Sequence, residues 1–343
     1  MTLRLIEIFI ALDKAGKLIE ILGQFKESEI LHQVATNGKI NVKVLVPAEQ
    51  SESLLDTLEE TFAHLDHFRI VIQSIEAIVP RVLPSQDDFP TPEKLEEKSE
   101  EKTSAVHLPR VSREELYSDV LEAGQLSHTF MTMLVLSSIV AAIGLIRGNS
   151  AIVIGAMVIA PLLGPNMALA LAATLGDIKL AGKAKKANII GILTPVVLSA
   201  VVGCLLKTDL MVSEEIASRT TVSISDIVLA LAAGCAGTLS FTLATASALI
   251  GVMVAVALLP PLVTCGLLIG AGQFEFAFGA FLLAATNLIC VNIAGVTTFL
   301  VQGIRPLKWW QQNTAKKATI RAYIIWVALL GALLTLILIS YGS

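Results

Sequence analysis

The sequence predicts an α-helical integral membrane domain of about seven spans, preceded by an α+β domain of ferredoxin-like order. Composition gives the first observation: 54% of the 343 residues are hydrophobic and 16% are charged, with a mean hydropathy of +0.74. Soluble domains carry about 25% charged residues. The charge is also segregated, because long stretches between residues 130 and 300 hold almost none. Only residues 1–80 show strand patterns.

Residues 1–80 form the first predicted domain. Strands are expected at 3–10, 30–36, 39–46 and 68–75, and helices at 13–25 and 51–65. Ile40, Val42 and Val44 alternate with polar residues, as in a strand with one buried face. Asn37-Gly38 just before them is a strong hairpin signal, since both central residues of a type I′ turn need φ > 0. The order β-α-β-β-α-β is that of a ferredoxin-like split βαβ domain.

Fold alone does not assign a function to this first domain. By analogy, domains of this shape bind regulatory amino acids or nucleotides, or assemble through the sheet, and we weigh ligand sensing and pure assembly equally. No cofactor site is evident, so a nucleotide or an amino acid is the regulatory ligand that the analogy suggests. No concentrated basic surface points to nucleic acid as a partner.

Metal and enzyme sites are not indicated by the sequence. The four cysteines lie in apolar segments without CxxC spacing, and the five histidines form no ligand motif. No nucleophile–base or metal constellation is present, so we do not expect an enzyme.

Residues 81–126 are expected to form a charged linker and a short helix. The run Glu93–Lys102 and several prolines give too little apolar content to bury, which predicts a flexible segment. Ser112-Arg-Glu-Glu115 then has capping-box spacing. The helix that it starts either couples the first domain to the membrane domain or is a plain connection, and the sequence favours neither.

The rest of the chain is divided by apolar runs of about 20 residues, the length that a helix needs to cross a bilayer. The expected spans are 129–146, 151–175, 187–206, 227–245, 248–270, 278–301 and 322–340. They group into a first membrane repeat at 127–207, a second at 226–304, and an extra span within 305–343.

Loop charges predict the orientation in the cytoplasmic (inner) membrane. The side of the first domain receives most of the basic loop residues, namely Lys179, Lys183, Lys185, Lys186, Arg305, Lys308, Lys316, Lys317 and Arg321. Basic residues on the opposite side are offset by acidic ones. The first domain is therefore expected in the cytoplasm and the C-terminus outside, with Trp309 and Trp310 at the inner boundary.

Two pairs of segments suggest an internal repeat. Gly155–Pro165 and Gly251–Pro261 share six of eleven residues at an offset of 96, and both contain Pro and Gly interruptions. Asn188–Thr194 resembles Asn292–Thr298 at an offset of 104, which would place the same polar pair alike in both halves. With three spans per copy the second copy is inverted, and inverted repeats place a solute site near the bilayer midplane.

The segment Ile154–Leu171, with its sequence IGAMVIAPLLGPNMALAL, resembles the signature of an uncharacterised hydrophobic-domain family of bacterial and archaeal membrane proteins, grouped as domain of unknown function 389. The resemblance covers roughly residues 115–305. It implies a membrane fold with a cytoplasmic-type first domain and an additional span. It implies no substrate and no catalytic residue.

Neutral groups must carry any membrane site, because no Asp, Glu, Lys or Arg lies in the middle of a predicted span. Helix N-termini restarting after the Pro breaks would suit an anion, and carbonyls freed before the breaks would suit Na⁺. The candidate pathway residues are Pro161, Gly164, Pro165, Asn166, Asn188, Thr194, Pro260, Pro261, Asn292 and Thr298. The alternative is that Asn and Thr bond neighbouring helices, and that Gly144-x-x-x-Gly148 and Gly266-x-x-x-Gly270 pack helices closely.

These patterns favour a membrane transporter of a small solute or ion with a cytoplasmic sensing or assembly domain. A channel is the nearest alternative, since conduction needs only a wet, interrupted pathway. A membrane-anchored sensor of a nucleotide or amino acid, without transport, is the alternative of a different class. The expected partners are the lipid membrane, the solute or ion, and further copies of the chain in a homo-oligomer.

Overall fold

The computed structural model describes residues 3–25, 29–36, 39–65, 68–74, 111–206, 210, 213–243, 258–305 and 309–342. The chain divides into two compact units, Met1–Glu115 and Leu116–Ser343. The division falls inside one helix, α3 (Arg113–Ala123). The domain limits expected at residues 80 and 126 stay predictions.

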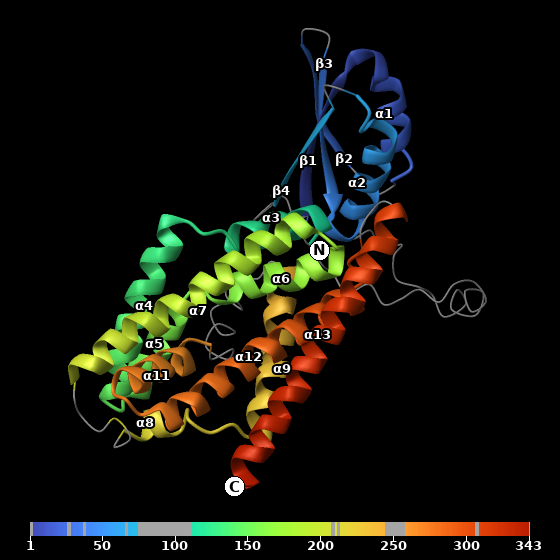
Figure 1. The fold of residues 1–343 in the computed structure, drawn as a ribbon. Coiled ribbons are helices and arrows are strands. Elements are labelled where there is room, and N and C mark those ends of the chain that lie inside the picture. The colour runs from blue at the N-terminus through green and yellow to red at the C-terminus, as the bar shows by residue number, and fades with distance from the viewer. Residues whose placement is uncertain are drawn as a thin grey trace, which may run out of the picture. The chain divides into compact units, whose positions relative to one another are not determined.

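The first unit has the strand and helix order expected from the sequence (Figure 1). Its elements are β1 (Leu3–Ala11), a short 3-10 turn (Leu12–Lys14), α1 (Ala15–Leu22), β2 (Glu29–Thr36), β3 (Lys39–Pro47), α2 (Ala48–Phe62) and β4 (Arg69–Ser74). The four strands pair antiparallel in the order β2-β3-β1-β4. Strand β1 is therefore central, and its Ile6 lies opposite Val44 of β3 and Ile72 of β4. The expected Asn37-Gly38 turn lies outside the described residues.

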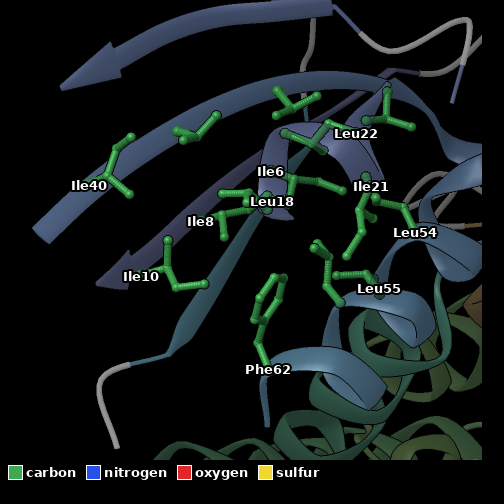
Figure 2. Packing of buried hydrophobic residues seen from close by; sticks show 14 residues of the cluster. Ile6, Ile8, Ile10, Leu18, Ile21, Leu22, Ile40, Leu54, Leu55 and Phe62 are labelled. Atoms are coloured by element: carbon green, nitrogen blue, oxygen red, sulfur yellow. The ribbon is translucent and has the colours of Figure 1, made fainter. Parts of the chain in front are cut away.

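One apolar core joins both helices to one face of this sheet (Figure 2). Alternate residues of β1 and β3 are buried, as their period of two requires. The helices contribute residues spaced three and four apart, which lie on one helical face. The core consists of Ile6, Ile8, Ile10, Leu18, Ile21, Leu22, Ile40, Val42, Val44, Val46, Leu54, Leu55, Leu58 and Phe62.

The first turn of α3 is bound to this unit by ion pairs. Arg4 of β1 pairs with Glu115 at 3.0 Å, and Arg113 pairs with Asp56 of α2 at 3.2 Å. The Glu115 amide donates to the Ser112 hydroxyl at 3.3 Å, so the expected helix start at Ser112 is confirmed. Both arginine side chains are largely buried, which makes these pairs more than surface contacts.

The second unit is helical. Its helices after α3 are α4 (His128–Ile146), α5 (Ser150–Ile159), α6 (Leu163–Leu175), α7 (Ile178–Leu206), α8 (Glu214–Ala217), α9 (Ile224–Thr242), α11 (Leu259–Gly270), α12 (Phe274–Val301) and α13 (Trp309–Gly342). Among the described helices, α4, α7, α9 and α12 are long and apolar enough to cross a membrane, and the bent pair α5–α6 could form a fifth span. Several apolar helices thus support a multi-pass membrane protein, whereas the count of seven stays a prediction.

The break expected in the second span is present. Helix α5 ends at Ile159 and α6 begins at Leu163, with a bend of 50° between them at Pro161. In the corresponding later segment, Pro260 and Pro261 lie in the first turn of α11. Proline is accommodated there, because the first N–H groups of a helix have no intrahelical partner. The part of that segment before Leu258 lies outside the described residues.

Three pairs of helices begin 96 residues apart: α4 and α9 at 128 and 224, α6 and α11 at 163 and 259, α7 and α12 at 178 and 274. Gly176 and Gly272, which have positive φ angles after α6 and α11, keep the same spacing. The similarity of Asn188–Thr194 to Asn292–Thr298, at an offset of 104, does not fit this spacing. Asn188 is the eleventh residue of α7 and Asn292 the nineteenth of α12, so the two do not occupy equivalent positions along their helices.

Helix α7 begins nine residues before the expected span, at Ile178 rather than 187, because Asp177 caps it. The Asp177 Oδ1 atom accepts the amides of Lys179 and Leu180 at 2.9 and 3.0 Å. Its Oδ2 atom accepts the Tyr117 hydroxyl of α3 at 2.8 Å. A residue beyond the apolar run therefore determines where this helix starts.

We expect Asp177→Ala to lower the free energy of unfolding by about 1 kcal/mol, as loss of a helix cap does. Burial raises the pKa of Asp177, but bonds from the Leu180 amide, the Tyr117 hydroxyl and the Lys179 amide outweigh burial and hold it below the ordinary 3.8. A carboxyl with a depressed pKa stabilises the fold above its ordinary value, and this contribution is lost as the pH falls through the folded pKa.

Thermal unfolding of the wild type and Asp177→Ala between pH 7 and pH 3 measures how the contribution of Asp177 to stability depends on pH. The gap between the two melting temperatures should be constant above about pH 5 and should narrow below about pH 4. Tyr117→Phe removes one of the hydrogen bonds to Asp177. Its melting temperature should therefore differ from that of the wild type by less than the melting temperature of Asp177→Ala does. A gap that is unchanged at pH 3 would contradict the role of the Asp177 charge.

Candidate functional site

A cavity of about 160 Å³ lies among four helices of the second unit, at the α5–α6 break and the start of α11. Helices α6 and α7 supply one part of its wall, and α11 and α12 supply the other. Its lining residues are Leu162, Asn166, Asn188, Ile192, Leu258, Leu262, Phe281, Ala284, Ala285 and Leu288.

The wall of this cavity repeats along the sequence. Eight of the ten lining residues form four pairs that are 96 residues apart, the same spacing that separates the starts of the helices. The pairs are Leu162 with Leu258, Asn166 with Leu262, Asn188 with Ala284, and Ile192 with Leu288. Residues of α6 and α7 and residues 96 positions later, at α11 and α12, thus line one space.

Two buried asparagines form a hydrogen-bonded pair beside the cavity. The Asn292 Nδ2 atom of α12 donates to Asn166 Oδ1 at 2.9 Å, although 126 residues separate them. Each amide also donates to a carbonyl one turn earlier, Asn166 to Leu162 and Asn292 to Leu288, both at 2.8 Å. Asn292 Oδ1 is buried and has no hydrogen-bond partner among the described residues. The pair therefore joins α12 to α6.

Asn188 is the second amide on the cavity wall. Its Nδ2 atom donates to the Pro165 carbonyl at 3.0 Å, which joins α7 to the first turn of α6. The side chain is half-buried. Within the described part of the chain its Oδ1 atom has no hydrogen-bond partner.

The other expected pathway residues do not line the cavity. Pro260 and Pro261 are buried at the start of α11, and Thr298 is buried in α12. Gly164 contacts the end of α3, where a Cβ atom would overlap the Ala123 carbonyl. Thr194 is half-buried on α7. Pro161 lies in the break itself. A role for these residues in a solute path stays a prediction.

The close-packing interpretation is confirmed for one of the two glycine pairs. Gly266 and Gly270 of α11 face the backbone of α7, and a Cβ atom on either would overlap carbonyl oxygens of Val196 and Ala200 respectively. Gly148, in contrast, follows α4 in a turn with φ of 61°. Its spacing from Gly144 is therefore produced by a turn and not by two contacts on one helix.

Sequence reasoning missed the apolar part of the cavity wall. Leu162 and Leu258 occupy equivalent positions of the repeated segment, so the repeat carried a signal for them. Phe281, Ala284 and Leu288 carried none, because they look like any other apolar residues of a membrane helix.

Comparison with known proteins connects this geometry to a family. The model of the family described as domain of unknown function (DUF389) matches residues 157–293, which include most of the α5–α6 pair, Asn166, Asn188 and Asn292. A protein of Methanocaldococcus jannaschii, itself described as uncharacterized, is 38% identical over 306 residues, which is 89% of this chain and 90% of that one. The chain belongs to the DUF389 family. No solved structure matches it.

The DUF389 match contains both asparagines of the buried pair, and a double-mutant cycle tests the bond between them. Asn292→Leu leaves Asn166 Oδ1 without its donor, and Asn166→Leu removes the acceptor. We expect the two changes together to cost less than their sum by about 1 kcal/mol, the range seen for hydrogen bonds between membrane helices.

Unfolding in mixed detergent micelles measures each term of this cycle. Asn188→Leu combined with Asn292→Leu is the control, since these two side chains share no bond and their effects should add. Additivity of Asn166→Leu and Asn292→Leu would contradict a stabilising bond between the halves.

Proposed function

We propose that this chain is a membrane transporter of a small solute, with the cavity between α6–α7 and α11–α12 as its solute site. The observation that carries the proposal is the repeated wall: four pairs of lining residues are 96 positions apart. Transporters built from inverted repeats bind their solute near the bilayer midplane, at the interface of the repeats and beside broken helices. The α5–α6 break lies directly on this cavity.

The proposal includes two inverted repeats, α4–α7 and α9–α12. The equal spacing of three helix pairs supports a repeat. An odd number of spans in each copy would invert the second copy in the membrane. Alternating access then follows from movement of one copy against the other around a fixed site, and a mechanism of this kind needs no nucleophile and no metal.

Charge supports the proposed orientation in the inner membrane. The first turns of α7 carry Lys179, Lys183, Lys185 and Lys186, all of them exposed. Basic residues next to a span favour the cytoplasmic side. With the predicted number of spans, we propose that the first domain lies in the cytoplasm and the C-terminus outside. We also propose that the first domain senses a nucleotide or amino acid, or mediates homo-oligomer assembly.

Accessibility of a single thiol from each side of the membrane tests transport without knowledge of the solute. Ala284→Cys places a thiol on the cavity wall in a chain whose four native cysteines are replaced by alanine. Ala280→Cys, one turn away on α12, is the matched control because Ala280 is buried and does not line the cavity. Each variant is reconstituted in oriented vesicles and treated with a small membrane-impermeant methanethiosulfonate.

Transport predicts that the thiol at position 284 reacts when the reagent is added on either side, while the thiol at position 280 reacts from neither. Reaction from one side only would favour a sensor and overturn the proposal. Reaction from both sides together with ionic conductance across a planar bilayer would favour a channel.

A further inference from the structure

Resting on the proposed function, we propose that the cavity takes a small uncharged solute with an apolar body and one N–H or O–H donor, recognised by the Oδ1 atom of Asn188. The expectation of an anion or Na⁺ at the broken helices is the alternative that this proposal replaces. Four features of the site lead to it: the charge of the wall, the helix N-termini, the orphan acceptor and the route of entry.

Among the described residues, none that lines the cavity is charged. Eight of its ten residues are Leu, Ile, Phe or Ala, and the other two are asparagines. An ion transferred from water into such surroundings loses its hydration, which costs far more than neutral amides recover. A neutral solute carries no such cost, and its apolar surface gains free energy from contact with the wall.

The helix N-termini at the cavity are poor anion sites. An α-helix offers its first four N–H groups to a ligand. Pro165 removes one of these from α6, and Pro260 and Pro261 remove two from α11. The same prolines that identify the repeat therefore reduce the number of donors that would hold a carboxylate or phosphate.

The polar groups of the wall select a donor on the solute. Both polar atoms of Asn166 are already engaged, because its Oδ1 accepts from Asn292 and its Nδ2 donates to the Leu162 carbonyl. Asn188 uses one N–H group of its Nδ2 on the Pro165 carbonyl, whereas its Oδ1 accepts no bond from the described residues and is the acceptor left entirely open to a solute. A cavity of about 150 Å³ lined by Leu, Ile and Phe binds benzene, and this one has about 160 Å³. The solute is thus of the size of a phenol.

Besides the access from water that alternating access requires, the cavity has a lateral opening toward the bilayer. Phe281 lines the cavity and yet is 52% exposed, so it marks the edge of the opening. Exposed apolar side chains follow on both neighbouring helices, Phe278 on α12 and Ile189 and Leu193 on α7. In a membrane-spanning helix such a surface faces lipid. An uncharged amphipathic molecule partitions into lipid and reaches this opening directly.

Fluorine NMR of protein in lipid nanodiscs tests the proposal with three probes of one shape. 4-Fluorophenol has a donor, fluorobenzene has none, and 4-fluorobenzoate is an anion; empty nanodiscs correct for partition into lipid. We expect the wild type to bind 4-fluorophenol about three- to tenfold more tightly than fluorobenzene, the ratio that one hydrogen bond provides. It should not bind 4-fluorobenzoate.

Two variants locate the site. Asn188→Leu should remove the preference for 4-fluorophenol while fluorobenzene binding is kept, and Leu262→Phe should abolish both by filling the cavity. Leu329→Phe, an exposed position on α13, is the control for added volume. Binding of the three probes to the wild type tests the proposed solute class even where a variant unfolds.

Tighter binding of 4-fluorobenzoate, binding that requires Na⁺, equal binding of the two neutral probes, or no binding would each overturn this inference. The thiol experiment separates such a failure from that of the proposed function. Two-sided labelling at Ala284→Cys without binding of 4-fluorophenol means transport of another class of solute. Binding of 4-fluorophenol with one-sided labelling means that the site holds its ligand but does not transport it.

Discussion

Replacing Gly266 with alanine is expected to destabilise the second unit by about 3 kcal/mol, the upper end of the usual cost of overpacking, because the tight contact forces the backbone to move. A Cβ atom at this position would overlap the Ser199 hydroxyl and the Val196 carbonyl of α7. Neither can withdraw easily: the Ser199 hydroxyl is bonded to the Pro195 carbonyl, and Val196 belongs to the helix backbone. Since α11 and α7 both line the cavity, we also expect loss of ligand binding.

Gly331→Ala is the matched control for this prediction. Gly331 also lies inside an apolar helix, α13, but a Cβ atom there would meet nothing within 4 Å. Alanine is the better helix former by about 1 kcal/mol, so this variant should be as stable as the wild type or more so. Unfolding in mixed detergent micelles gives both values. Equal behaviour of the two variants would show that the α7–α11 contact is looser than described.

Replacing Phe62 with alanine is expected to lower the stability of the first unit by about 3–5 kcal/mol, the usual cost of deleting a buried aromatic ring. Phe62 is 1% exposed at the end of α2 and packs among the core residues of Figure 2. Its ring centroid lies 5.6 Å from that of Phe68, within the range of favourable aromatic pairs. A loss of this size is a large fraction of the stability of a small domain.

Hydrogen exchange of the β1 amides in the full-length protein measures this change in opening free energy. Ile19→Ala on the exposed side of α1 is the control and should shift it by no more than about 0.5 kcal/mol. Protection of α4 and α7 should be unchanged by Phe62→Ala if the two units unfold separately. Equal protection of β1 in both variants would contradict the assignment of Phe62 to the core.

Local patterns predicted the elements of this chain well. Alternation along β3 and the three-and-four spacing of α2 are local consequences of backbone period, so the strand and helix order of the first unit could be predicted from residues that are neighbours in sequence. The break at Pro161 is equally local, since proline lacks an N–H group. Helix α7 begins before the predicted span because a single capping carboxylate, Asp177, extends the helix beyond its apolar run.

The candidate site could be predicted only in part. Asn166 and Asn188 were identified from their polarity in apolar surroundings, and both line the cavity. The repeat of Asn188 and Asn292 was misleading, because similar short sequences lie at different positions of α7 and α12. Gly164 looked like part of the interruption, whereas its contact with Ala123 depends on how α6 lies against α3.

By itself, the sequence determined the membrane class, the order of the first unit and the position of the helix break, since composition, side-chain period and the missing proline N–H act over a few residues. Tertiary structure alone decided that Asn292 bonds Asn166 across 126 residues and that Leu162 and Leu258 meet at one cavity. Such contacts depend on the helix packing angles and on the close approach of glycine backbones, which no local pattern of residues encodes.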